Sequence, residues 1–70
     1  MKEKEYNITF EAHRRTSLFL YKIPNNIVYA KNKQSAKELG EAIIRDFYEQ
    51  KGSRNLDYMV KQYKLVITLQ

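Results

Sequence analysis

The sequence predicts an α+β fold of the order β-β-β-α-β, in which one amphipathic helix packs on one face of an antiparallel-rich, four-stranded sheet. Three observations predict it. Four stretches have the residue pattern of strands, whereas a single long stretch has helical spacing. Two glycines and one proline among 70 residues, together with six tyrosines, are typical of a folded chain. Because one helix shields only one face of a sheet, the other face is expected to be open.

Residues 1–70 are expected to form one small domain, because the chain is too short for a second core. At this size roughly 60% of the unfolded chain's surface is buried on folding, so small domains often need a disulfide, a metal or a partner subunit. The sequence contains no cysteine, which excludes disulfides and thiolate metal sites. Association with a second subunit is the remaining common means of stabilisation, so we expect a homodimer.

The first strand is predicted over residues 6–12, where apolar and polar side chains alternate as on a half-buried strand. A second strand is predicted over residues 16–23. Its two faces are both apolar or aromatic, so it is expected to lie at the centre of the sheet. Residues 24–26 combine one proline with two asparagines, which is typical of a turn. A short third strand over residues 27–30 follows.

The helix is predicted to begin at Ser35, because Ser35 and Glu38 have the spacing of a capping box. Gly40 is expected to let the helix approach the sheet closely, and Gly52 is expected to end it. The predicted apolar stripe consists of Ala36, Leu39, Ile43 and Phe47, with Ala42 and Ile44 beside it. The predicted solvated row consists of Lys37, Glu41, Arg45 and Glu49.

Residues 53–62 fit either a short second helix or an alternating strand, and we favour a crossover with a turn of helix. Residues 63–69 alternate again and predict the last strand. The core is expected to bring Leu39, Ile43 and Phe47 of the helix onto strand residues Ile8, Phe10, Leu18, Leu20, Leu65 and Ile67. The side chains left on the open face, which predict an interface, are Phe19, Tyr21, Tyr29 and Val66.

No motif predicts catalysis, a cofactor or a small-molecule substrate. His13 is the only histidine, and no serine or acid has the spacing of a catalytic triad or of a carboxylate pair. No cluster of histidines and acids has metal-ligand spacing, and two glycines cannot make a phosphate loop of the usual type. We therefore expect a non-enzymatic protein. Because no signal peptide or membrane span is visible, we expect it to be cytoplasmic.

The charge pattern predicts a binding or regulatory module that contacts nucleic acid. The net charge is +5, and arginine and lysine both suit phosphate oxygens. The predicted contact residues, at a strand junction and near the helix start, are Arg14, Arg15, Lys31, Lys33 and Lys37. A solvated turn or protection of a sheet edge would also explain the two arginines.

The aromatic residues of the open face allow two interpretations. They could stack on unpaired bases, or they could be buried against a second copy of the chain, which we favour because a marginal core gains from it. The alternative function is a small regulator, of the kind carried by phages or mobile elements. Such a protein would bind and inhibit or regulate an acidic host protein through its open sheet face.

Overall fold

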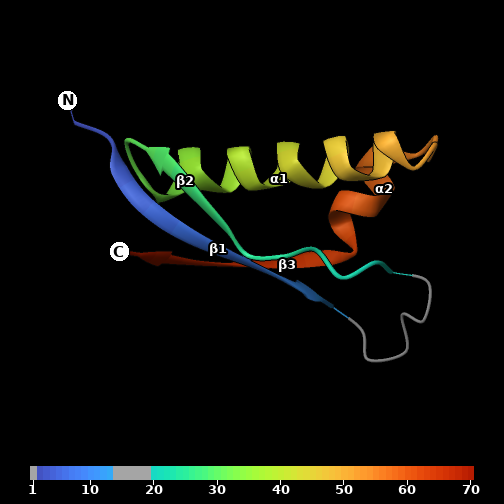
Figure 1. The fold of residues 1–70 in the computed structure, drawn as a ribbon, viewed down its shortest axis with the longest axis horizontal. Helices are drawn as coiled ribbons and strands as arrows, with labels where there is room; N and C mark the ends of the chain where they lie inside the picture. The colour runs from blue at the N-terminus through green and yellow to red at the C-terminus, as the bar shows by residue number, and fades with distance from the viewer. Residues whose placement is uncertain (1, 14–19) are drawn as a thin grey trace.

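The computed structural model describes residues 2–13 and 20–70 (Figure 1). This part of the chain contains three strands and two helices, in the order β1 (Lys4–Ala12), β2 (Asn26–Ala30), α1 (Lys33–Gln50), α2 (Leu56–Lys61) and β3 (Tyr63–Leu69). The α+β class and the antiparallel sheet are therefore confirmed. The predicted count of four strands and one helix is wrong, because the described residues form three strands and a second short helix.

β1 is the central strand of the sheet, whose order is β2-β1-β3. Both neighbours run antiparallel to it, with Tyr6 opposite Val28 of β2 and Ile8 opposite Ile67 of β3. β2 and β3 therefore run in the same direction at the two edges, and the helices connect them. Figure 1 shows α1 along one side of the sheet and α2 between the end of α1 and β3.

The segment 20–23 belongs to no strand, although it falls within the second predicted strand. Two tyrosine hydroxyls bond its backbone in place of a neighbouring strand. Tyr48 Oη accepts the N–H of Tyr21 at 3.1 Å, and Tyr63 Oη donates to the carbonyl of Tyr21 at 2.5 Å. Ile23 is buried in the core. The apolar pattern of this segment therefore reflects partial burial without strand pairing. Residues 16–19 of the predicted strand lie outside the described residues.

The two faces of the sheet differ in polarity. The face under α1 carries Tyr6, Ile8 and Phe10 of β1, all buried, beside Leu65 and Ile67 of β3. The open face is mostly polar, and of the six tyrosines only Tyr29 is one of its strand residues. Its residues are Glu5, Asn7, Thr9, Glu11, Ile27, Tyr29, Lys64, Val66 and Thr68.

The ends of α1 are set by Asn32 and Gly52. Asn32 Oδ1 accepts the N–H of Ser35 at 2.8 Å, so Asn32 is the N-cap and the helix begins two residues before the predicted start at Ser35. Both residue types cap helices well, which is why the sequence pattern alone chose the wrong one. Gly52 has a φ of 82° and donates to Glu49, while Ser53 donates to Tyr48. This is a Schellman motif, and it confirms the predicted stop.

The buried side of α1 is turned away from its predicted apolar stripe. The residues buried against the sheet are Ala36, Gly40, Ile44 and Tyr48. Leu39 is 42% exposed, so its predicted place in the core is wrong, while Ile43 and Phe47 pack at the edge of the core. A Cβ on Gly40 would clash with Leu65 Cδ2 and lie 3.1 Å from Ile8 Cδ1. Gly40 therefore allows the close approach that was predicted, and this contact turns Leu39 outward.

Candidate functional site

The predicted phosphate-contacting residues do not all come together. Lys31 and Lys33 are exposed where the chain passes from β2 into α1. Lys37 is exposed one turn further along the helix. Arg14 and Arg15 lie outside the described residues. Among the described residues of the predicted set, Lys37 lines a groove that is also lined by other basic residues.

This groove of about 390 Å³ lies where α1, α2 and the start of β3 meet. Four different elements or element ends each contribute one basic residue to its lining, namely His13, Lys37, Lys61 and Lys64. Glu41 is the one acidic residue of the lining, and Val60, Tyr63 and Leu65 complete it. We call this the basic groove.

The pairing of β1 with β3 places His13 and Lys64 at the groove. Ala12 is opposite Tyr63, and the backbone N–H of His13 donates to the carbonyl of Gln62 at 3.0 Å. The antiparallel ladder therefore brings the end of β1 to the start of β3. In the sequence, Arg14 and Arg15 follow His13 directly.

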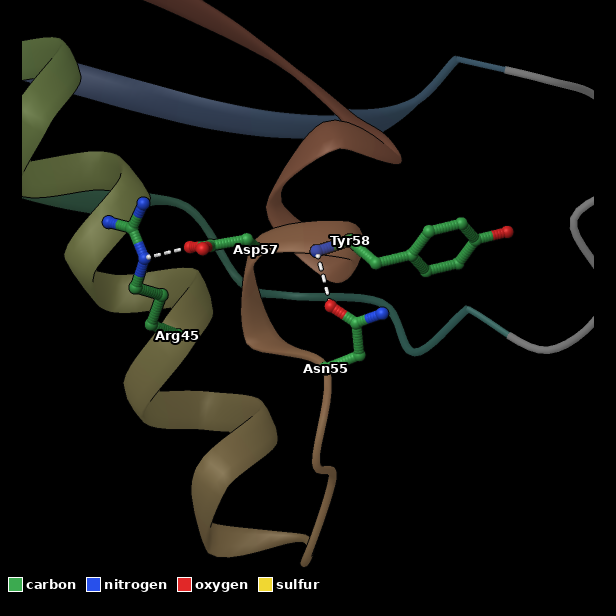
Figure 2. Close-up of polar contacts among 4 residues, drawn as sticks. All are labelled: Arg45, Asn55, Asp57 and Tyr58. Carbon is green, nitrogen blue, oxygen red and sulfur yellow. Dashed lines mark hydrogen bonds and ion pairs between the residues drawn. The ribbon is translucent and has the colours of Figure 1, made fainter.

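A short helix, α2, carries Lys61 to the groove. Figure 2 shows its N-cap, where Asn55 Oδ1 accepts the N–H of Tyr58 at 3.2 Å. Figure 2 also shows Arg45 of α1, whose Nε donates to Asp57 Oδ1 at 3.2 Å. Because the side chains of this ion pair are 43% and 80% exposed, it contributes little stability. The burial of Val60 is the stronger anchor of α2.

The lysines of the groove carry charges that no described carboxylate neutralises directly. The ion pair of Arg45 with Asp57 is the one found among the described residues, so Lys37, Lys61 and Lys64 make none there. Glu41 lies one helical turn from Lys37, and Glu11 lies opposite Lys64 in the sheet. Three lysines thus line the groove together with one acidic residue. The groove is positively charged at neutral pH.

Tyr63 adds no negative charge to this region. Burial of its hydroxyl raises the pKa of Tyr63 above its ordinary value of 10.0. Its hydroxyl is therefore neutral at physiological pH and serves as a hydrogen-bond donor.

The predicted interface residues do not form one patch. Tyr21 packs against α1, with its ring centroid 6.0 Å from that of Phe47, and Lys51 Nζ lies 4.4 Å from the centroid of the Tyr21 ring. Tyr29 and Val66 do lie on the open face, but on opposite edge strands with β1 between them. Phe19 lies outside the described residues.

Sequence reasoning missed Lys61 and Lys64 as members of the site. Neither residue has a local signal, since each is a single lysine at the end or start of an element. They meet His13 and Lys37 only because β3 pairs with β1 and α2 packs on α1. That arrangement could be found from the strand register but not from the spacing along the chain.

No group of three histidine, aspartate or glutamate side chains suited to a metal ion occurs within residues 2–13 and 20–70. Neither α1 nor α2 has the length and apolar character of a membrane-spanning helix. No protein-family model, curated protein or solved structure matches this chain.

Proposed function

We propose that this protein is a non-enzymatic binding module that contacts nucleic acid through the basic groove. The observation that carries the proposal is the convergence of His13, Lys37, Lys61 and Lys64 on one groove. Lysines without a carboxylate partner can exchange their counterions for phosphates at small cost, and the released ions favour binding. A groove lined by such residues suits a polyanionic backbone.

Positive charge continues along α1 beyond the groove. Lys33 precedes Lys37 by four residues, so it lies on the same side of the helix at a rise of about 6 Å. Arg14 and Arg15 follow His13 in the sequence and belong to the predicted contact residues. The binding residues that we propose therefore extend the predicted set by His13, Lys61 and Lys64.

The expected mode of binding is independent of nucleotide sequence. Contacts with phosphates position a protein on its ligand but do not read bases. Stacking of bases on the open face has little support, because Tyr29 is the single described aromatic residue among its strand positions. Backbone attraction is therefore expected to supply most of the affinity.

Binding should weaken steeply with salt, and it should depend on the lysines of the groove. We expect the logarithm of the association constant for a mixed-sequence DNA duplex to fall linearly with the logarithm of salt concentration. The substitutions Lys37→Gln, Lys61→Gln and Lys64→Gln together should reduce the slope by about 2–3, because each phosphate contact contributes about 0.9. Fluorescence anisotropy across a salt series measures this slope for duplex and single-stranded probes.

The matched control removes three lysines that do not line the groove, namely Lys2, Lys4 and Lys22. This triple glutamine variant has the same net charge as the groove variant, and it should change the slope by less than about 1. Equal losses in the two variants would show that only net charge matters. No retention of any probe at high micromolar protein in low salt would contradict the proposal.

The alternative, a regulator that binds an acidic protein through the open face, has less support. Glu5 and Glu11 lie on that face against Lys64, so the face offers an acidic partner little attraction. A pull-down from a nuclease-treated host lysate separates the two functions. One stoichiometric protein that is retained after nuclease treatment would favour the alternative.

A further inference from the structure

The edge strand β2 lacks the features that usually prevent strands from pairing between molecules. Its sequence Asn26–Ala30 contains no charged residue and no proline, and its register with β1 is continuous from Asn26 to Ala30. No described strand pairs with its outer side. Lysines, prolines and bulges protect most exposed edges, so an uncharged regular edge is suited to adding another strand.

Apolar side chains border this edge on both faces of the sheet. On the open face, Ile27 is 49% exposed and Tyr29 is 58% exposed. On the helix side, a groove of about 600 Å³ between β2 and α1 is lined by Val28, Leu39, Ala42 and Ile43, with Arg45, Asp46 and Glu49 at its rim. We call it the apolar groove. Three of the six large apolar side chains that are exposed among the described residues, namely Ile27, Tyr29 and Leu39, border this one edge.

The charges along α1 also favour an antiparallel neighbour. Its first turn contains no acidic residue and its last turn no basic one, so its charges oppose the helix dipole at both ends. Lys31 precedes its start on the side of Leu39, and Asp46 and Glu49 line the apolar groove near its end. A second α1 that runs antiparallel beside it would bring Lys31 of each copy toward Asp46 and Glu49 of the partner subunit.

From these observations we propose that a second copy of the chain adds to the β2 edge in antiparallel orientation and fills the apolar groove. The two sheets would join into one sheet of six strands, with both α1 helices on the same side. Residues paired across two strands point to the same face, so this arrangement requires Val28 to pair with a residue that also faces the helices. Pairing Val28 with Val28 of the partner subunit is the one such register that uses all five residues of β2.

This register has specific consequences for the side chains. On the open face, Ile27 would lie opposite Tyr29 of the partner subunit, so four apolar side chains would form one continuous cluster. On the helix side, Leu39 would enter the apolar groove of the partner subunit. The β3 edge is less suited to the same contact, because its strand contains Lys64, and lysines are typical of edges that are protected from pairing.

The mass in solution tests this proposal. Light scattering should show the mass of the full chain rising with concentration from 8.4 kDa to twice that value. The variants Ile27→Lys and Leu39→Lys should each weaken the dimer at least tenfold, since each places a charge at the seam. Both side chains are exposed in the monomer, so circular dichroism and the melting temperature should stay close to those of the wild type. Leu69→Lys is the matched control, because Leu69 is 55% exposed on the β3 edge.

Cross-linking tests the register. The chain has no cysteine, so Val28→Cys introduces a single thiol that should meet its counterpart across the two-fold axis. Residues opposed on antiparallel strands lie within the Cα separation that a disulfide allows. Oxidation with copper phenanthroline should therefore give a covalent dimer, whereas Leu69→Cys should give little. A mass of 8.4 kDa at every concentration would overturn the proposal, as would loss of the dimer in Leu69→Lys with retention in the two seam variants.

Discussion

Three tyrosines close a ring of hydrogen bonds that fixes residue 21 against the core. The hydroxyl of Tyr63 donates its proton to the carbonyl of Tyr21. Tyr48 must therefore be the donor in the 2.5 Å hydrogen bond between the hydroxyls of Tyr48 and Tyr63. Tyr48 in turn accepts the N–H of Tyr21. Each polar group in the ring has a partner, which is what burial of a hydroxyl requires.

Removing the Tyr63 hydroxyl should change how the free energy of unfolding depends on pH in the alkaline range. Because burial raises the pKa of Tyr63, the contribution of its hydroxyl to stability is fully present below pH 10 and is lost as the pH rises above that value. The variant Tyr63→Phe should lose about 1–2 kcal/mol near pH 7 through the unmade hydrogen bonds. Its free energy of unfolding should then fall less steeply than that of the wild type above pH 10. Urea unfolding at several pH values measures both effects.

The control is Tyr58→Phe, because the Tyr58 side chain is 56% exposed on α2. This variant should follow the wild type at every pH. If the free energy of unfolding of Tyr63→Phe also falls in parallel with that of the wild type above pH 10, ionisation of the buried hydroxyl is not coupled to folding.

At the scale of the element, a single side chain determines where α1 begins. Asn32 accepts the N–H of Ser35, whereas the sequence pattern had assigned the cap to Ser35 itself. An N-cap supplies an acceptor to one of the N–H groups that have no partner in the first turn. The structure places Ser35 inside that turn, where its hydroxyl is not needed for capping.

Substitution distinguishes the two caps. Asn32→Ala should lower the free energy of unfolding by about 1 kcal/mol, because one N–H of the first turn loses its acceptor. Ser35→Ala should change it by less than about 0.5 kcal/mol, since alanine is the better helix former. Thermal and urea unfolding of both variants test this. A larger cost for Ser35→Ala would restore the start predicted from the capping-box spacing.

At the scale of the molecule, the two grooves lie on opposite sides of the central strand. The apolar groove adjoins β2, the basic groove adjoins β3, and β1 separates them. A dimer formed through β2 would therefore leave both basic grooves exposed, one at each end of the joined sheet. The proposed association and the proposed binding do not compete for the same surface.

This separation predicts how breaking the dimer affects binding. The Ile27→Lys monomer should bind a short oligonucleotide, which reaches one groove, within about threefold of the wild type. A duplex long enough to reach both grooves should bind the wild type at least tenfold more tightly than this variant, because the second contact is intramolecular. Anisotropy titrations with the two probes measure the difference. Loss of short-probe binding in Ile27→Lys but not in Leu69→Lys would show that the two surfaces are coupled.

Much of the local structure could be predicted because it depends on neighbours in the chain. Alternation of apolar and polar residues predicted β1 and β3 to within two residues, since side-chain direction along a strand has a period of two. The short strand predicted over residues 27–30, after the turn, matches β2 to within one residue. Gly52 predicted the end of α1 because its backbone angle is one that glycine adopts easily. The short helix within residues 53–62, favoured over a strand, is also confirmed. For the candidate site, local sequence supplied Lys37 and drew attention to His13.

What the sequence determined by itself, then, is the type of each element, because propensity, capping chemistry and periodicity act over a few residues. Only the tertiary structure decided which strand is central, which side of α1 is buried and which basic residues share a groove. These features depend on contacts between distant segments, such as Gly40 on Ile8 and Leu65, or the hydroxyls of Tyr48 and Tyr63 on the backbone of Tyr21. The net charge is visible in the sequence, but folding determines where that charge gathers.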